Sequence, residues 1–394
     1  MIVFAERCHG TVTAPPSKSA LHRRLILNRI AGRIDHPVDA CSDVRTTADC
    51  LSRLGTDQVL DCGDCGASLR FLLPVSLLFG GADFTGTDAL KARPILPLLK
   101  ELNAHGAHID GESLPISARG TLRSGAYALS GDVSSQFFSG LCMTLPFLSG
   151  DSTLCRTSPL QSAGYVALTE RMLREHGVSL QHIENGFRII GGQTAKVCDR
   201  PVEGDWSCAA AMLIFGAMCG SVTVTGLDLQ SDQPDRRILD VLEQCGAHVQ
   251  TDGSSVTASR GTLRGFKCSG SEAPDLVPVL AALACASQGD SVLYRLDRLR
   301  YKESDRFAAL TMLLGDLGAN FETERSDTIV IHGSGSVRGG TTNVPPDHRM
   351  VMAAALMSGC SAAPVKLSHA ECVQKSYPAF FKDFQSLGGL IDAS

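Results

Sequence analysis

The sequence predicts an α/β (α+β) protein built as two domains, and three observations support this prediction. Its 394 residues exceed what one ordinary hydrophobic core accommodates. Six apolar helical stretches recur along the chain, and six amphipathic stretches alternate with them. Short β-rich runs, such as residues 222–225, lie between the helical stretches. Each unit therefore reads as strand, buried helix, strand, outer helix and further strand, and six units suggest three per domain.

The six apolar stretches each begin at a short polar turn and close on a glycine. Some, such as residues 208–218, are apolar on nearly every side, which is typical of buried helices. The closing glycine suits the left-handed position after a helix end. The stretches are residues 17–32, 66–81, 134–150, 205–220, 274–289 and 347–359.

The six amphipathic stretches also end in short turns that close on glycine. We expect His105 and His176, at two of these ends, to face the negative end of the helix dipole. The closing glycines are Gly55, Gly106, Gly177, Gly246, Gly318 and Gly388.

The spacing of the buried helices predicts the domain boundaries. Only 47 residues follow Asp347, fewer than the later units span, and the first 17 or so residues would complete the last unit. The chain is therefore expected to start in one domain, build the other over residues 17–202, and return. The second domain then comprises residues 1–16 and 203–394.

Composition and charge exclude several functional classes. A net charge of −5 and 5% aromatic residues do not favour nucleic-acid binding. Residues 1–5 are too short for the apolar part of a signal peptide, and no apolar run reaches the length of a membrane span. The fifteen cysteines are an odd number, which favours free thiols and a cytoplasmic location. Cys62 and Cys65 form a CxxC motif without a second pair or histidines at ligand spacing, so no metal is expected.

A charged stretch, residues 299–306, is the first candidate for a functional site. A strand-like run at residues 291–296 precedes it, and a helix-like run at residues 307–317 follows. Ser304 or Asp305 suits the helix cap, and Lys302 and Arg306 share a face if the helix starts early. Two cations beside Glu303 suit an anionic substrate that also needs a proton moved. The alternative is a solvated helix start.

The starts of the buried helices are the second candidate. Helix N-termini attract anions, and serine or aspartate there is explained by capping alone. Capping does not explain cations in or near the first turns, which are unfavourable unless an anion compensates. Lys18, Arg23, Arg70 and Arg349 are such cations. Two domains that face each other with these helix starts would form an anion-binding active site in the cleft.

With these residues in place, the chain resembles the 5-enolpyruvylshikimate-3-phosphate (EPSP) synthase family over nearly its whole length. The motifs appear in order and at the spacing of that family. They are Pro16-Ser17-Lys18-Ser19 with Arg23, Gly66-Ala67-Ser68-Leu69-Arg70, Arg93-Pro94-Ile95, Ser134-Ser135-Gln136-Phe137, Ser162 with Tyr165, Glu203-Gly204-Asp205, Pro274-Asp275, Lys302-Glu303-Ser304-Asp305-Arg306, Asp347-His348-Arg349 and Glu371-Cys372-Val373-Gln374-Lys375-Ser376.

The resemblance implies a two-domain enolpyruvyl transferase-like fold, each domain with three βαβαββ units. It also implies transfer of the enolpyruvyl group of phosphoenolpyruvate to the 5-hydroxyl of shikimate 3-phosphate, with release of phosphate, on the route to chorismate and the aromatic amino acids. No metal or other cofactor is implied. The expected partners are these two small molecules, with no nucleic acid or membrane, and the expected state is a monomer.

The family's site residues carry over to matching positions. For shikimate 3-phosphate they are Lys18, Ser19, Arg23, Ser134, Ser135, Gln136, Ser162, Tyr165, Asp275 and Lys302. For phosphoenolpyruvate they are Lys18, Gly66, Arg93, Gln136, Arg306, Arg349 and Lys375. The catalytic set is Asp275, Glu303, Lys302 and Lys18. Which of the two carboxylates, Asp275 or Glu303, deprotonates the hydroxyl stays open.

This chain departs from the family pattern at a few positions. Ala67 and Phe71 follow the glycine of the site, and they bear on packing around phosphoenolpyruvate. Ala163-Gly164 and Arg298 bear on shikimate contacts. Gly66 leaves room for glyphosate, so ordinary sensitivity is expected.

The sequence disfavours two rival functions and indicates structural roles for several single residues. The sister transferase that acts on a UDP-amino sugar uses a cysteine, and the segment around Arg93 has none. A non-catalytic anion-binding protein would lack Asp275, Glu303 or Lys302. Structural roles are expected for His348 and Trp206, and Asp43 and Asp49 are expected to be surface charges.

Overall fold

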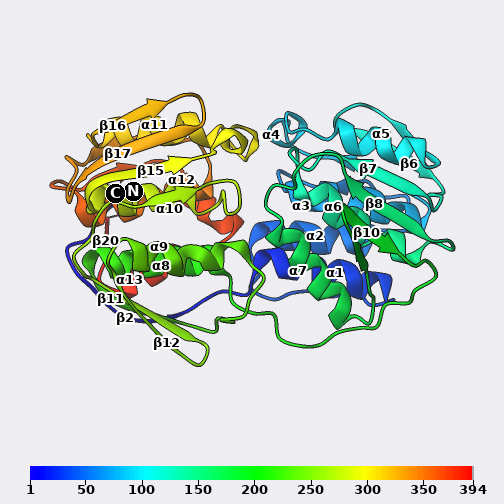
Figure 1. The fold of residues 1–394 in the computed structure, drawn as a ribbon, viewed down its shortest axis with the longest axis horizontal. Coiled ribbons are helices and arrows are strands. Elements are labelled where there is room, and N and C mark those ends of the chain that lie inside the picture. The colour runs from blue at the N-terminus through cyan, green and yellow to red at the C-terminus, as the bar shows by residue number, and fades with distance from the viewer. Residues whose placement is uncertain (393–394) are drawn as a thin grey trace. The chain divides into compact units, whose positions relative to one another are not determined.

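The computed structural model describes residues 1–392, which divide into two compact units (Figure 1). Unit 1 joins Met1–Ser17 to Glu203–Ser394, and unit 2 is Lys18–Val202. The chain thus starts in unit 1, builds unit 2 and returns. This division differs by one residue, Ser17, from the predicted one.

Unit 2 contains three inner helices, α1 (Lys18–Ile30), α3 (Gly66–Ser76) and α6 (Ser135–Cys142), and three outer helices, α2 (Ser42–Arg53), α5 (Leu96–Ala104) and α7 (Gly164–Glu175). Short helical segments complete it: η1 (Leu77–Phe79), α4 (Asp88–Lys91) and η2 (Leu145–Phe147). One sheet has the order β3 (Leu60–Asp61), β4 (Ala82–Thr85), β6 (Ile116–Gly120), β5 (Ala107–Asp110). The other has the order β7 (Ala126–Leu129), β8 (Ser152–Arg156), β10 (Gly186–Ile189), β9 (Gln181–Ile183).

Unit 1 repeats this plan. Its inner helices are α8 (Trp206–Cys219), α10 (Val277–Ala286) and α12 (His348–Met357), and its outer helices are α9 (Ile238–Gln244), α11 (Arg306–Asp316) and α13 (Phe380–Ser386). Its 3₁₀ segments are η3 (Pro234–Arg237), η4 (Asp297–Tyr301), η5 (Ser358–Cys360) and η6 (Ala370–Lys375). The inner helices are the predicted apolar stretches, and every residue of α8 and α12 is buried.

Three sheets surround the inner helices of unit 1. The first has the order β12 (His248–Asp252), β13 (Ser255–Ser259), β11 (Gly220–Thr225), β2 (Cys8–Thr13). The second has the order β14 (Lys267–Ser269), β15 (Gln288–Tyr294), β17 (Thr328–Ser334), β16 (Phe321–Glu324). The third has the order β18 (Gly340–Thr342), β19 (Val365–Leu367), β1 (Ile2–Phe4), β20 (Leu390–Asp392). The N-terminal strand β1 pairs with β19 and β20, so residues 2–4 contribute to the last unit as predicted. The second N-terminal strand, β2, instead pairs with β11 in another sheet, which the sequence did not predict.

All five sheets share one hydrogen-bonding pattern. Each begins with a parallel pair and continues with two antiparallel pairs, as in β2, β11, β13 and β12. Parallel neighbours need a crossover connection, and the repeat supplies helices for it. The repeat that the sequence predicts is therefore seen in the structure as one strand-pairing pattern that recurs from sheet to sheet.

The first repeat differs from the expected pattern. In the described part of the chain, residues 31–41 and 190–202 form no strand, so no sheet accompanies α1 and α2. Pro37 and Pro201 lack the N–H that a ladder needs. Side chains hold these segments instead: Asn28 on α1 accepts a hydrogen bond from the Cys198 N–H at 3.0 Å, and its amide donates to Asp35 at 2.6 Å.

Each unit has its own hydrophobic core, as the two-domain prediction requires. Trp206 is fully buried in the core of unit 1, which confirms its structural role. Among the described helices, none has both the length and the apolar character needed to cross a membrane.

Candidate functional site

In unit 1 the predicted site residues gather around Arg306, the first residue of α11. Asp305 caps this helix by accepting a hydrogen bond from the Ala308 N–H at 3.0 Å, as the sequence suggested. The helix therefore starts one residue earlier than residue 307. Lys302 lies before the helix in extended conformation, so it does not share a helical face with Arg306.

The Arg306 guanidinium binds three carboxylates. Its Nη1 lies 2.8 Å from Asp275, its Nη2 lies 2.7 Å from Glu303, and its Nε lies 2.8 Å from Asp347. Burial by itself would lower the pKa of Arg306, but Asp347, Glu303 and Asp275 raise it above its ordinary value. A planar fork with several donors suits this multiple binding, which a lysine would not reproduce.

Asp347 is the structural anchor of the group. It is fully buried, caps α12 by accepting from the Arg349 N–H at 2.9 Å, and accepts from the Ser304 hydroxyl at 3.0 Å. The sequence placed Asp347 at a helix start and assigned it no role in the site. His348 is buried beside it with its Nδ1 3.7 Å from Asp347, in keeping with the structural role expected for it.

The second cation that contacts Asp275 is Lys302, at 3.1 Å. Burial lowers the pKa of Lys302, and Arg306 adds to that effect against the opposing charge of Asp275. Burial works to raise the pKa of Asp275, yet Lys302, Arg306 and Arg349 hold it well below its usual range. Asp275 is therefore a firmly ionised carboxylate at neutral pH.

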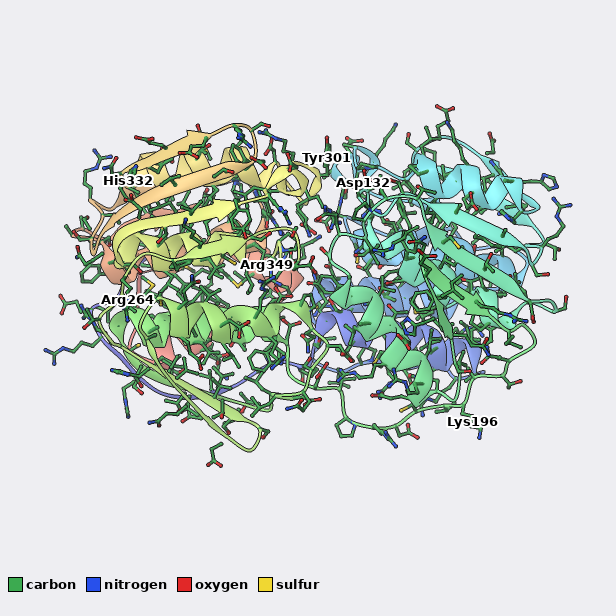
Figure 2. The ribbon with its side chains drawn as sticks, in the orientation of Figure 1. Asp132, Lys196, Arg264, Tyr301, His332 and Arg349 are labelled. Carbon is green, nitrogen blue, oxygen red and sulfur yellow. The ribbon has the colours of Figure 1, made fainter. Side chains whose placement is uncertain are left out.

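Arg349 and Lys375 are the remaining predicted cations of unit 1. Arg349 is the second residue of α12 (Figure 2), and its side chain is 2% exposed. In the described structure, its Nε and Nη1 have no hydrogen-bond partner. Burial works to lower its pKa, but Asp275 and other acidic groups raise it. Lys375 is also buried, at the end of η6.

In unit 2, Arg23 is buried among α1, α6 and α7. Its Nε donates to Thr169 at 2.7 Å, its Nη1 to the Ser19 carbonyl at 2.7 Å, and its Nη2 to Ser139 at 3.1 Å and to the Tyr165 carbonyl at 2.9 Å. Four of its five N–H groups are thereby engaged. Burial lowers the pKa of Arg23 to about 10.

Two departures from the family pattern can now be located. The centroid of the Phe71 ring lies 5.0 Å from the guanidinium carbon of Arg23. Phe71 therefore packs against a residue that is predicted to bind shikimate 3-phosphate. The sequence had associated Phe71 with phosphoenolpyruvate. The segment with Ala163-Gly164 leads into α7, where Ser162 takes a left-handed conformation with φ of 54°.

The starts of α3 and α6 bring a second set of groups together. Arg70 donates to the Gln136 side chain and to the Pro94 carbonyl, both at 2.9 Å. A methyl group on Gly66 would lie 2.6 Å from Arg70 Nη1 and 2.7 Å from Arg93 Nη1. Two guanidinium groups therefore lie against Gly66, which is consistent with an anion-binding position. Arg70 was noticed in the sequence as a cation near a helix start, but it received no role.

Lys18 at the start of α1 pairs with Asp43 in the first turn of α2, at 2.8 Å. The expectation that Asp43 is a surface charge was wrong, because this turn faces α1 and Asp43 is buried. Asp49, by contrast, is exposed as expected and pairs with Arg53.

Each unit thus gathers its predicted residues at the starts of its inner helices or in the segments that pack there. Unit 2 contains Lys18, Ser19, Arg23, Gly66, Arg93, Ser134, Ser135, Gln136, Ser162 and Tyr165, and unit 1 contains Asp275, Lys302, Glu303, Arg306, Arg349 and Lys375. Ser134 caps α6 by accepting from the Gln136 N–H at 3.3 Å.

Comparisons with known proteins place this geometry in context. The family model described as EPSP synthase (3-phosphoshikimate 1-carboxyvinyltransferase) matches residues 56–384. A protein of Clostridium kluyveri named 3-phosphoshikimate 1-carboxyvinyltransferase is 37% identical over 98% of this chain and 96% of its own length. A protein of Methanothrix thermoacetophila with the same name is 37% identical over the full length of both chains.

Solved structures show a similar fold. EPSP synthase from Acinetobacter baumannii superposes with a TM-score of 0.79 at 22% identity and covers 98% of both chains. The enolpyruvyl transferase NikO from Streptomyces tendae gives a TM-score of 0.78 at 17% identity over 99% of this chain and 98% of its own. At these identities the likeness bears on the fold alone.

Proposed function

Because this chain belongs to the EPSP synthase family, we infer that it transfers the enolpyruvyl group of phosphoenolpyruvate to the 5-hydroxyl of shikimate 3-phosphate. The products are 5-enolpyruvylshikimate 3-phosphate and phosphate, formed by addition and elimination. The observation that carries the assignment of chemistry is the group of Asp275, Glu303 and Lys302 around the buried Arg306.

We propose that unit 2 supplies most of the groups for shikimate 3-phosphate. The serines at the starts of α6 and α7, Ser134, Ser135 and Ser162, offer hydroxyls and backbone N–H groups for its phosphate. Arg23 keeps one N–H beyond its four internal bonds, enough for one contact to the carboxylate. Ser19, Gln136 and Tyr165 complete this proposed set.

Phosphoenolpyruvate carries a phosphate and a carboxylate, and several cations suit it. We propose Lys18, Arg93, Arg306, Arg349 and Lys375 for these charges, with Gly66 leaving room at the start of α3. The buried Nε and Nη1 of Arg349 are donors that an anion would satisfy.

The pKa shifts bear on which group moves each proton. A general base works best when its pKa lies near the operating pH. The pKa of Asp275 lies well below its usual range, because of Lys302, Arg306 and Arg349, so Asp275 is a weak base in this arrangement. We therefore assign Asp275 to orienting the hydroxyl and Glu303 to accepting the hydroxyl proton and exchanging protons with the methylene carbon. The lowered pKa of Lys302 suits a proton donor near the transferred group.

Phosphate release that requires both substrates tests this function. Purified protein should release phosphate from phosphoenolpyruvate when shikimate 3-phosphate is present and not when it is left out. Folded protein that releases none with both substrates would remove the proposed function.

The Glu303→Gln variant tests the chemical role. It should reduce kcat by roughly 10²- to 10⁴-fold, the range of acid–base catalysis, while both anions still bind. Glu322→Gln is a matched control, because Glu322 is 70% exposed in the same unit. Loss of substrate binding in the Glu303 variant would mean that Glu303 serves binding instead.

We also propose that the protein acts as a monomer in the cytoplasm without a cofactor. All fifteen cysteines are free thiols in the described structure, which supports a reducing compartment. Light scattering on the reduced protein measures the oligomeric state directly.

A further inference from the structure

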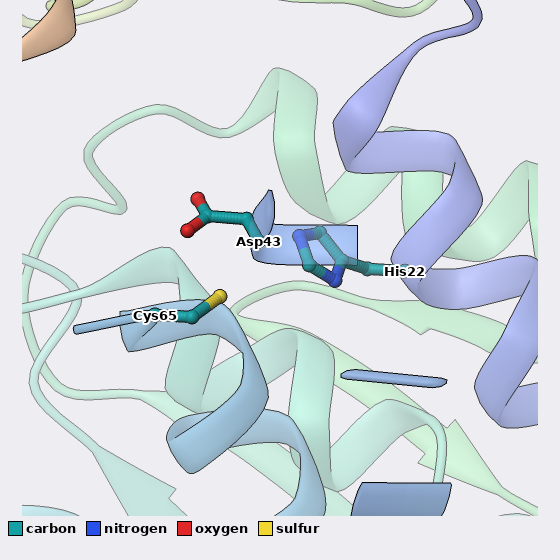
Figure 3. A group of neighbouring side chains, drawn as sticks. All are labelled: His22, Asp43 and Cys65. Carbon is teal, nitrogen blue, oxygen red and sulfur yellow. The ribbon is translucent and has the colours of Figure 1, made fainter. Parts of the chain in front are cut away.

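Three metal-ligating side chains that the proposed reaction does not use lie together in unit 2. They are His22 on α1, Asp43 on α2 and Cys65 at the start of α3 (Figure 3). A ring nitrogen, a carboxylate oxygen and the sulfur lie within 4.8 Å of one another, and all three residues are buried. This group has no local signal in the sequence, because the CxxC motif of Cys62 and Cys65 has no histidine nearby along the chain.

The surrounding contacts resemble those of a prepared metal site. His22 Nδ1 lies 2.7 Å from the Thr47 hydroxyl. This contact fixes the orientation of the imidazole ring, so that Nε2 points away from Thr47. A histidine that binds a metal commonly donates its other ring N–H to an oxygen in this way. Thr47 also lies 2.6 Å from the Ser68 hydroxyl, so one residue links α1, α2 and α3.

Cys65 lies at the start of α3, with its sulfur beside the backbone N–H groups of the first turn. It is the N-cap of α3, and its sulfur accepts from the Ser68 N–H at 3.5 Å. Backbone N–H groups and the helix dipole at such a position stabilise negative charge on sulfur.

The donor set selects the class of metal. Nitrogen, oxygen and sulfur ligands suit zinc and cobalt, whereas magnesium and calcium prefer oxygen alone. Zinc bonds of about 2.0–2.3 Å place tetrahedral ligands roughly 3.3–3.8 Å apart. The ligand atoms, which lie within 4.8 Å of one another, would therefore have to approach by up to about 1–1.5 Å through side-chain rotation. Three protein ligands would leave a fourth position for water.

A second contact of Asp43 links the proposed metal site to the proposed reaction. Its carboxylate binds the Lys18 ammonium at 2.8 Å. A dication bound by Asp43 would compete with that ammonium for the same carboxylate and repel it. We propose that His22, Asp43 and Cys65 form an inhibitory site for a zinc-class divalent cation, which acts by separating Lys18 from Asp43. The inhibitory part rests on the proposed function, in which Lys18 binds phosphoenolpyruvate.

Metal binding is tested without reference to activity. Reduced, chelator-treated full-length protein is dialysed against Zn²⁺, and Co²⁺ serves as the spectroscopic probe. We expect one tight ion per chain and a thiolate-to-cobalt charge-transfer band. Cys65→Ala and His22→Gln should each weaken binding roughly tenfold or more and remove or shift the band. Far-UV circular dichroism checks that each variant is folded.

Cys62→Ala is the matched control, since Cys62 is buried three residues away and lies outside the group. It should keep the bound ion and the cobalt band. Wild-type protein without a tight zinc ion, or equal binding in the folded Cys65→Ala protein, would overturn the site. Mg²⁺ at the same concentration should not compete.

The effect on turnover is measured separately. Zn²⁺ should inhibit phosphate release by wild type at least tenfold, chelator should reverse this, and Cys65→Ala should resist it. Zinc that binds without slowing wild-type turnover would overturn the inhibitory role. If zinc-free wild type releases no phosphate, the proposed function fails while the dialysis result still decides the metal site.

Discussion

Arg306 binds three carboxylates from three different segments, so its replacement would disturb more than one pair. Asp275 precedes α10, Glu303 precedes α11 and Asp347 precedes α12. Leaving one partner of a buried ion pair uncompensated is costly. The geometry of the proposed proton-transfer groups therefore depends on one buried side chain.

Gly66 supports a sharp prediction. In Gly66→Ala the new methyl group would lie within 2.7 Å of both Arg70 and Arg93, so these guanidinium groups must move. Displaced guanidinium groups would lose a hydrogen bond to the anion, which is worth about 1.5–3 kcal/mol for a charged group, so we expect kcat/KM for phosphoenolpyruvate to fall roughly 10- to 150-fold. Steady-state kinetics measures this fall.

A control and a related expectation accompany this variant. Gly315→Ala adds a methyl group into open space on α11 and should leave kinetics unchanged. Wild-type turnover should be sensitive to glyphosate, as the room at Gly66 implies. Normal kinetics in the folded Gly66→Ala protein would argue against an anion at this position.

Asp275 predicts a pH dependence of stability. Its pKa in the folded chain lies well below the ordinary 3.8, because Lys302, Arg306 and Arg349 outweigh burial. The ionised form is thus favoured by folding, and this stabilisation is present above pH 3.8 and is lost as the pH falls toward the folded value. Wild type should exceed Asp275→Asn in unfolding free energy at pH 7, and the difference should shrink below about pH 4.

Urea unfolding of both proteins across this pH range measures that difference. Asp252→Asn is a control, since Asp252 is an exposed carboxylate of the same unit. A difference between wild type and Asp275→Asn that stays constant from pH 7 to pH 3 would contradict the depressed pKa.

From the sequence, the charged residues of the site are easier to predict than the residues with which they pair. Lys302, Glu303 and Arg306 stand out because two cations and a carboxylate fall within one short stretch. In the structure Lys302 and Arg306 both contact Asp275, and Arg306 also binds Glu303. Asp43 was misjudged, because burial depends on which face of α2 packs on α1. Asp347 and Thr47 make contacts across 41 and 25 residues, and such pairings leave no local signal.

At the scale of elements, two aspartate caps allow a direct comparison. Asp305 caps α11 and is exposed, whereas Asp347 caps α12, is buried and binds Arg306. Asparagine caps helices about as well as aspartate but carries no charge. We expect Asp305→Asn to leave stability nearly unchanged and Asp347→Asn to lose roughly 1.5–3 kcal/mol, the worth of a hydrogen bond to a charged group.

Chemical denaturation of the two variants checks this pair. The Asp347 variant should also lose turnover, because Arg306 would no longer be anchored. Equal, small losses in both variants would show that capping alone explains Asp347.

Helices were more predictable than sheets for a physical reason. The inner helices are apolar runs closed by glycine, and both signals are local, so α8, α10 and α12 fall inside the predicted stretches. Sheets depend on pairing with distant segments. For the repeat of α1 and α2, no strand forms in residues 190–202, where Pro201 lacks an N–H and the Cys198 N–H binds the Asn28 side chain instead.

At the scale of the whole molecule, the two separate cores predict unfolding in more than one step. The single tryptophan, Trp206, is fully buried in unit 1 and donates its ring N–H to the Asp228 carbonyl at 3.1 Å. Its fluorescence therefore reports on unit 1, while far-UV circular dichroism reports on helices of both units. We expect the two signals to give different urea midpoints.

The same urea unfolding experiment with a bound substrate distinguishes the two units further. Shikimate 3-phosphate should stabilise unit 2 by mass action and shift the circular dichroism curve more than the fluorescence curve. Curves from the two signals that coincide with and without the substrate would show that the units unfold together.

The burial of the thiols has a practical consequence for measuring motion. Burial raises the pKa of Cys142 in unit 2 and of Cys285 in unit 1 to about 12, so near neutral pH only about one in 10⁵ of these groups is a reactive thiolate. An alkylating reagent would reach them when the surrounding helices open. Mass spectrometry of the labelled peptides would then time the opening of each unit separately, without any introduced probe.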